Sequence, residues 1–97
     1  MEREIITRLA KTFEESAYQE KDVEYWLARD LQELLEYTKW SNFALVIEKA
    51  KIACENSKQN ISDHFADVSK MVRLGSGSER KIDDLMLTRY ACLMVAS

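Results

Sequence analysis

Basic side chains gather on both sides of a short glycine–serine segment, GSGS at residues 75–78; they are Lys70, Arg73, Arg80 and Lys81. Ammonium and guanidinium groups are common protein ligands of phosphate, and a glycine-rich segment lets backbone N–H groups approach an anion closely. If the segment is the loop of a hairpin, these bases would contact DNA phosphates as a wing does beside a groove. The pattern therefore predicts a phosphate-binding hairpin.

A second interpretation of the same hairpin needs no ligand. Three acids, Glu79, Asp83 and Asp84, lie close to the bases in sequence and would neutralise them as ion pairs around a solvated turn. A nucleotide-binding P-loop is excluded, because GSGSERK lacks the GxxxxGK[ST] spacing and no helix follows it directly. The sequence leaves the phosphate-binding hairpin and the solvated turn as the two alternatives.

A further group of polar side chains falls at the start and on the outer side of a helix predicted over residues 41–57: Lys39, Asn42 and Lys49. A shorter helix precedes it, so the pair can be a helix-turn-helix or an ordinary pair of core helices, and the short connection allows either. The seven predicted DNA-binding residues are therefore Lys39, Asn42, Lys49, Lys70, Arg73, Arg80 and Lys81.

Other residue types offer little chemistry. His64 is the single histidine and has no adjacent nucleophile, and the two cysteines are not in a CxxC motif. The adjacent acids Asp83 and Asp84 would point to opposite faces of a strand, so they cannot gather around a metal as a nuclease requires. We expect no catalytic residue, no metal ligand, no cofactor and no enzymatic activity.

The net charge of −3 is unevenly distributed along the chain. Residues 1–38 carry ten acids and five bases, residues 39–58 four bases and two acids, and residues 59–97 five of each. The acidic surplus thus lies wholly in the first third, and the remainder can present a basic face to DNA.

The central elements that must position these residues are a strand and two helices. Residues 23–27 alternate as a strand does, and Asp30 with Glu33 forms a capping-box pattern at the start of the first helix. The second helix has an apolar stripe at three- and four-residue spacing: Trp40, Phe43, Ile47, Ala50 and Cys54. We expect both tryptophans, Trp26 and Trp40, in the core.

The flanking elements follow from the same patterns. Residues 2–13 predict a helix, residues 14–22 a solvated connection, and residues 68–87 a β-hairpin around the glycine–serine loop. Thr88 can cap a last helix, which is apolar on every side and therefore needs cover. The cover would come from a second chain, in a homo-oligomer through this C-terminal helix, or from more of the natural protein that once followed.

Leu45 and Ile52 point away from the stripe of the long helix. We expect another segment to cover them; the alternative is a partner surface.

The expected fold class is α+β, with a small antiparallel sheet, made of one strand plus the β-hairpin, packed against three or four helices. Ninety-seven residues are enough for one domain, residues 1–97. No apolar run is long enough for a membrane span, and the acidic N-terminus lacks the core of a signal peptide. We therefore expect no membrane association and a cytoplasmic location, where Cys54 and Cys92 would be reduced core residues.

Two long blocks carry a family resemblance: EYWLARDLQELLEYTKWSNFALVIEKAKIACENS and DHFADVSKMVRLGSGSERKIDDLMLTRYAC. In order and spacing they resemble the N-terminal region of the DNA-damage-inducible protein D family, a bacterial member of the Bro-N class that also occurs in phage antirepressors and viral proteins. The resemblance covers about residues 13–95. It departs from the family in residues 14–22 and at the end, ACLMVAS, where the family continues, so we expect a truncated member or a fragment.

The resemblance implies a small α+β domain of the bacterial DNA-damage, or SOS-type, response that binds DNA and has no catalytic activity. An alternative function is a protein-interaction module that acts on the recombination or repair machinery without contacting DNA. The DNA sequence and the strandedness that such a domain prefers do not follow from these residues.

Overall fold

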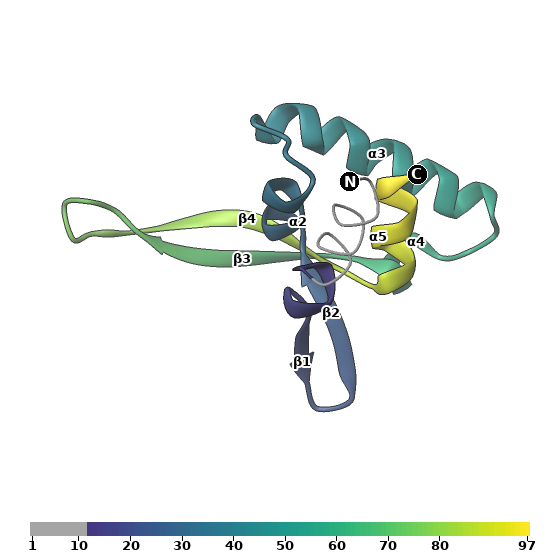
Figure 1. Cartoon of the computed structure of the whole chain (residues 1–97), viewed down its shortest axis with the longest axis horizontal. Coiled ribbons are helices and arrows are strands. Elements are labelled where there is room, and N and C mark those ends of the chain that lie inside the picture. The colour runs from purple at the N-terminus through teal and green to yellow at the C-terminus, as the bar shows by residue number, and fades with distance from the viewer. Residues whose placement is uncertain (1–11) are drawn as a thin grey trace, which may run out of the picture.

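The computed structural model describes residues 12–97 and shows an antiparallel sheet combined with helices (Figure 1). The strands pair in the order β1-β2-β4-β3, so the expected α+β class is confirmed. In chain order the elements are β1 (Tyr18–Glu20), β2 (Val23–Leu27), α2 (Ala28–Leu34), α3 (Trp40–Asn56), α4 (Ile61–His64), β3 (Phe65–Arg73), β4 (Glu79–Leu87) and α5 (Arg89–Ala96). The helix predicted over residues 2–13 lies outside the described residues except at its end, where residues 12–15 are helical.

The sheet consists of two hairpins that meet only at their roots. Strands β2 and β4 are paired through Trp26 with Leu87 and through Leu27 with Met86, whereas β3 and β4 are paired over nine residues. Beyond this seam the β1–β2 hairpin and the β3–β4 hairpin project separately, as Figure 1 shows. The seam therefore orients both hairpins relative to the helices.

Strand β1 corrects the expectation that residues 14–22 form a solvated connection. Lys21 adopts a left-handed backbone conformation, with φ of 58°, and this closes a tight turn between β1 and β2. Tyr18 lies opposite Tyr25, and their rings stack with centroids 5.2 Å apart. Three exposed, mostly polar residues carry no alternation that would reveal a strand, which is why the pattern was missed.

The core lies between the root of the sheet and the helices α2, α3 and α5. On α3, Phe43, Ile47, Ala50 and Cys54 are buried as predicted, while Trp40 packs against the core and is half-buried. Trp26 is fully buried on β2, stacks on Phe13 and donates its indole N–H to the Phe13 carbonyl at 2.8 Å. The prediction of core tryptophans is thus confirmed for Trp26 and holds in part for Trp40.

The structure bears on two predictions about helix surfaces, and it corrects the first of them. Leu45 and Ile52 on α3 are 64% and 61% exposed, so the expected covering segment is absent among the described residues. Helix α5, in contrast, packs against α3, and its side chains Ala91, Cys92 and Val95 are buried. One face of α5 is thus covered within the domain, whereas its Leu93 is 62% exposed, and a homo-oligomer through α5 stays a prediction.

The start of α5 is capped as predicted. The Thr88 hydroxyl accepts a hydrogen bond from the Ala91 N–H at 3.1 Å and lies 2.7 Å from His64 Nδ1.

Burial raises the pKa of the Cys92 thiol to about 12, so this side chain stays a neutral thiol near neutral pH. Both cysteines are buried and free, as expected of reduced core residues.

Candidate nucleic-acid interface

The β3–β4 hairpin, which we call the arm, projects far from the helices that the structure describes (Figure 1). Its two nine-residue strands are in regular antiparallel register from Phe65 opposite Leu87 to Arg73 opposite Glu79. Residues 70–81, the outer part of the arm, carry four bases and one acid, a net charge of +3. The predicted hairpin around the glycine–serine loop is confirmed.

Hydrogen bonds close the tip of the arm. The Leu74 N–H donates to the Ser78 carbonyl at 2.8 Å, the Gly77 N–H donates to the Leu74 carbonyl at 2.9 Å, and the hydroxyls of Ser76 and Ser78 are 2.8 Å apart. Gly77 has φ of +87°, a conformation that residues with a Cβ rarely adopt. The tip is therefore a defined turn, and the positions that flank it are fixed relative to each other.

The register divides the arm into two faces, because residues directly opposite each other in an antiparallel pair share a face. The inner face carries Val68, Lys70, Val72, Arg80, Ile82 and Asp84. The outer face carries Ser69, Met71, Arg73, Glu79, Lys81 and Asp83, all of them exposed. The four predicted phosphate ligands are thus distributed two to each face.

Lys70 differs from the other three bases. Its ammonium group lies 3.9 Å from the Asp30 carboxylate of α2, and it is half-buried. The same carboxylate accepts a 2.8 Å hydrogen bond from the Tyr18 hydroxyl, which raises the pKa of that phenol above its ordinary value. Lys70 therefore helps to tie the arm to α2 and β1.

Arg73, Arg80 and Lys81 are exposed, and they form no ion pair among residues 12–97. The expected neutralisation of these bases by Glu79, Asp83 and Asp84 is therefore not found in the described part of the chain. Asp83 and Asp84 contact Arg29 instead, Asp84 through its carboxylate and Asp83 through its backbone carbonyl.

The root of the arm is anchored to α2 by Asp84 and Arg29. Asp84 is 2% exposed, and its Oδ1 accepts hydrogen bonds from the backbone N–H groups of Arg29 at 3.1 Å and Leu85 at 2.8 Å. The Arg29 side chain donates from Nε to the Asp83 carbonyl at 2.8 Å, and its guanidinium lies 4.2 Å from the centre of the Trp40 ring. These contacts fix the direction in which the arm projects.

Asp84 also corrects the predicted capping box. The N-cap position of α2 is Leu27, which has no side-chain acceptor, and Asp84 supplies the acceptor from β4. Asp30 lies inside the helix instead. An acid at an inward position of an alternating strand was the signal that sequence reasoning could have used, since a buried carboxylate needs partners.

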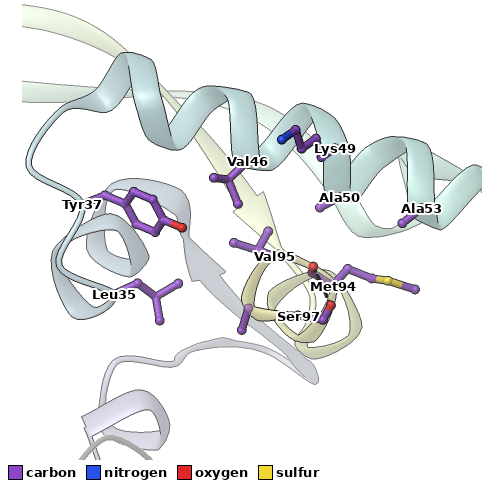
Figure 2. Close-up of a pocket in the computed structure, with 10 residues that line it drawn as sticks. Leu35, Tyr37, Val46, Lys49, Ala50, Ala53, Met94, Val95 and Ser97 are labelled. Carbon is purple, nitrogen blue, oxygen red and sulfur yellow. Dashed lines mark hydrogen bonds between the residues drawn. The ribbon is translucent and has the colours of Figure 1, made fainter.

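The predicted residues of α3 lie on a different surface. Lys39 directly precedes α3, Asn42 lies in its first turn and Lys49 lies near its middle, and all three are exposed. Lys49 also lines a groove of about 480 Å³ that Figure 2 shows between the end of α2, α3 and α5. The lining side chains are Leu35, Tyr37, Val46, Lys49, Ala50, Ala53, Met94, Val95, Ala96 and Ser97.

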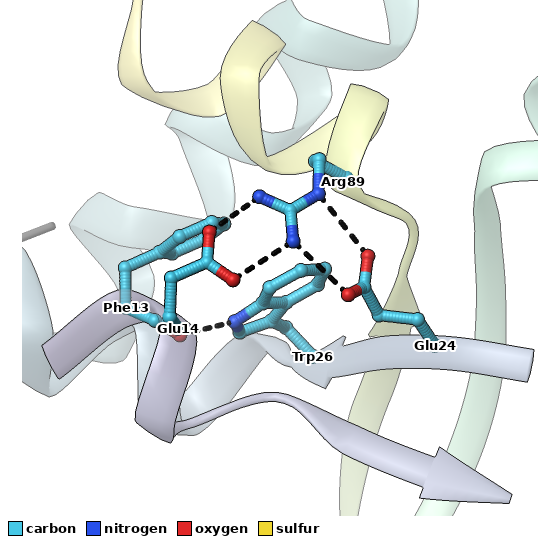
Figure 3. Close-up of polar contacts among 5 residues, drawn as sticks. All are labelled: Phe13, Glu14, Glu24, Trp26 and Arg89. Carbon is cyan, nitrogen blue, oxygen red and sulfur yellow. Dashed lines mark hydrogen bonds and ion pairs between the residues drawn. The ribbon is translucent and has the colours of Figure 1, made fainter. Parts of the chain in front are cut away.

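A cluster of charges surrounds Arg89 at the start of α5 (Figure 3). Its guanidinium donates to both carboxylate oxygens of Glu14, at 2.6 and 2.9 Å, and to both of Glu24, at 3.1 and 3.0 Å. The hydrogen bonds from Arg89 lower the pKa of the Glu14 carboxyl, and the two carboxylates raise the pKa of Arg89. Through these four hydrogen bonds, and with its guanidinium 5.0 Å from the centre of the Trp26 ring, Arg89 connects α5 to β2 and to the segment before β1.

Within residues 12–97, no group of three or more histidine, cysteine, aspartate or glutamate side chains is arranged to hold a metal ion. In the same part of the chain, no helix combines the length and the apolar character that a bilayer span needs.

Residues 15–96 match the Bro-N family, the N-terminal domain of BRO family proteins. The chain belongs to the Bro-N family. It is also 46% identical, over 72 residues, to the DNA damage-inducible protein D of Escherichia coli strain K12, so the predicted resemblance is confirmed. The match covers 74% of this chain and 26% of that protein, so the chain spans about a quarter of the relative's length. No solved structure matches the chain.

Proposed function

We propose that residues 1–97 are a single, non-enzymatic DNA-binding domain of an SOS-type, DNA-damage-inducible protein. The observation that carries this proposal is the arm, a projecting two-stranded ribbon whose outer part has a net charge of +3. The printed name of the Escherichia coli relative, DNA damage-inducible protein D, supports the connection with damage.

The proposed contacts are to phosphates. A two-stranded ribbon can lie in a groove of B-DNA, with phosphates on both of its sides. Arg73 and Lys81 on the outer face and Arg80 on the inner face therefore reach different strands of the duplex. Lys70 contributes less, because Asp30 already neutralises it. Phosphate contacts give affinity and orientation without reading sequence.

The test is a titration of a labelled 30-base-pair duplex at two salt concentrations. Each phosphate contact contributes about 0.9 to the slope of log affinity against log salt. The double variant Arg80→Glu/Lys81→Glu should bind all duplexes more weakly and lower the slope by about two. The matched control is Lys39→Glu/Lys49→Glu, which makes the same charge change on α3.

The two variants separate the candidate surfaces. The proposal requires a large loss for the arm variant and a small loss for the α3 variant. Unchanged affinity in a folded arm variant, with a loss in the α3 variant, would assign DNA contact to Lys39, Asn42 and Lys49 instead. A wild-type domain that binds no duplex at low salt would falsify the proposal.

A second candidate function has its own observation, the groove of Figure 2 beside the exposed aliphatic side chains of α3. Leu45 and Ile52 of α3 and Leu93 of α5 add exposed apolar surface to two of the helices that line this groove, which suits an amphipathic helix of a recombination or repair protein. Sedimentation of the domain alone at micromolar concentration tests self-association on this surface. If Leu45→Lys/Ile52→Lys abolishes function in cells while DNA affinity is unchanged, a protein partner is favoured.

A further inference from the structure

Two apolar side chains lie near the tip of the arm, among its bases. Met71 is 58% exposed and Leu74 is 42% exposed. Met71 lies on the outer face directly opposite Lys81 and two residues from Arg73, while Leu74 begins the tip turn. Apolar surface is thus exposed among the proposed phosphate ligands Arg73, Arg80 and Lys81.

The other large aliphatic side chains of the arm are less exposed than Met71 and Leu74. Its other aliphatic side chains beyond the root, Val68, Val72 and Ile82, lie on the inner face and are half-buried. The outer face is polar or charged at every position from Ser69 to Asp83 except Met71. One exposed apolar residue needs no explanation, but two of them at the end of a projecting basic ribbon form a specific constellation.

The backbone that carries these two side chains is held by hydrogen bonds. Both the N–H and the carbonyl of Leu74 are hydrogen bonded across the turn, to Ser78 and Gly77. Met71 lies within the regular ladder, opposite Lys81. The backbone therefore presents the two side chains in a fixed arrangement, while the flexible thioether chain of Met71 can adapt to an irregular surface.

We infer that Met71 and Leu74 form an apolar wedge that enters between base pairs of duplex DNA and kinks it. This inference rests on the proposed function, because the bases of the arm must first hold the duplex. Leucine and methionine are among the side chains that proteins insert between base steps, where they unstack them partly and bend the helix. The kink brings phosphates toward Arg73 and Lys81, which lie beside the wedge.

A wedge has a consequence for the DNA that the domain prefers. Unstacking requires free energy, and less of it is needed where the duplex is already mismatched or interrupted. The domain should therefore bind deformable duplexes more tightly than intact ones of the same sequence. This selectivity needs no contact with base edges.

The experiment uses two 30-base-pair duplexes of one sequence, one intact and one with two central mismatched pairs, each carrying a donor and an acceptor dye at its ends. Anisotropy measures affinity and energy transfer measures bending. The wild-type domain should bind the mismatched duplex about tenfold more tightly and should increase energy transfer in both duplexes. The variant Met71→Ser/Leu74→Ser should bind both duplexes with similar affinity, without the increase in energy transfer and with an unchanged salt slope.

The matched control is Leu45→Ser/Ile52→Ser, which removes two exposed aliphatic side chains from α3 and should behave as wild type. Circular dichroism checks that each variant is folded, and the single variant Met71→Gln serves if the double variant is not. Binding by the wild type without bending and without preference would overturn the wedge and leave the phosphate-binding arm intact. Bending by the serine variant equal to that of wild type would overturn it as well. A wild type that binds neither duplex overturns the proposed function and the wedge together.

Discussion

The two hairpins of the sheet have the same antiparallel architecture and share one seam, yet they differ in charge and in attachment. The β1–β2 hairpin, residues 18–27, carries three acids and one base, whereas residues 70–81 of the arm carry one acid and four bases. Tyr18 and Glu24 tie the β1–β2 hairpin to α2 and α5, through Asp30 and Arg89. The arm is anchored by Asp84 near its root and by Lys70, whereas Arg73, Arg80 and Lys81 at its outer end form no ion pair among the described residues.

The comparison indicates a division of labour between two similar elements. A hairpin whose side chains are bound to neighbouring helices braces the domain, and a hairpin whose charged end is exposed is available to a ligand. The opposite charges also orient the molecule, since an approaching polyanion is attracted to the arm and repelled from the β1–β2 hairpin.

The largest expected effect comes from breaking the seam that both hairpins share. Trp26→Ala should lower the free energy of unfolding by about 3–5 kcal/mol, because Trp26 is fully buried at the junction of β2 and β4. Such a loss is a large part of the stability of a small domain, so the urea transition should shift strongly or disappear. Trp40→Ala is the control and should have a smaller effect, because Trp40 is half-buried. Equal losses would contradict the assigned roles.

A smaller effect is expected from detaching the arm alone. Asp84→Ala should cost about 1–3 kcal/mol, because the N–H groups of Arg29 and Leu85 lose their acceptor in a buried place. Asp84→Asn keeps an acceptor oxygen and should be milder. Urea unfolding gives the stability, and amide exchange in β3 and β4 should accelerate more than exchange in β1. Uniform acceleration across all strands would argue against a local anchor.

A third variant makes the charges of the two hairpins more alike. Glu20→Gln/Asp22→Asn removes two of the three acids of the β1–β2 hairpin and should raise DNA affinity about two- to threefold at low salt, mainly through faster association. The gain should vanish at high salt, because exposed charges are screened. Stopped-flow association at two salt concentrations measures it. A gain that persists at high salt would mean that direct contacts, and not long-range repulsion, had changed.

The smallest expected effect concerns pH and the attachment of the segment before β1. Hydrogen bonds from Arg89 lower the pKa of the Glu14 carboxyl from its ordinary value of 4.5. As pH falls, the Glu14 carboxyl is protonated in the unfolded chain before it is protonated in the folded domain. The stability that the ionised Glu14 adds is therefore fully present above pH 4.5 and is lost as pH falls through the lowered pKa of the folded domain. Wild type and Glu14→Gln should therefore differ in stability at neutral pH and converge in acid. A constant difference from neutral to acid pH would show that the ion pair does not carry the effect.

Much of the fold was predictable because local patterns decide it. The stripe of α3 has helical spacing, the glycine–serine turn separates two strands, and Thr88 stands just before an apolar helix. Residues far apart in sequence decide what was missed. Capping of α2 by Asp84 depends on a contact between residues that are 55 positions apart. The pairing of β1 with β2 depends on a turn at Lys21, where the sequence has no glycine, asparagine or proline that would predict a turn.

The candidate site was predictable to the same extent. The bases around residues 75–78 could be found from their types and spacing, and the loop between them was correctly placed. The sequence did not show that Lys70 is held by Asp30, or that Arg73, Arg80 and Lys81 have no carboxylate partner among the described residues, because ion pairing depends on how α2 sits against the arm. Register, which assigns Met71 to the outer face, became known only with the paired strands.

The cap that Asp84 provides for α2 has a consequence for how the chain acquires its structure during synthesis. Arg29 is made 55 residues before the carboxylate that accepts its N–H, which at usual elongation rates is a delay of roughly 3–11 seconds. A seven-residue helix is too short to be stable alone during that interval. Helix α2 should therefore become stable only after β4 has emerged from the ribosome, so that the helix and the root of the arm form together in one late step.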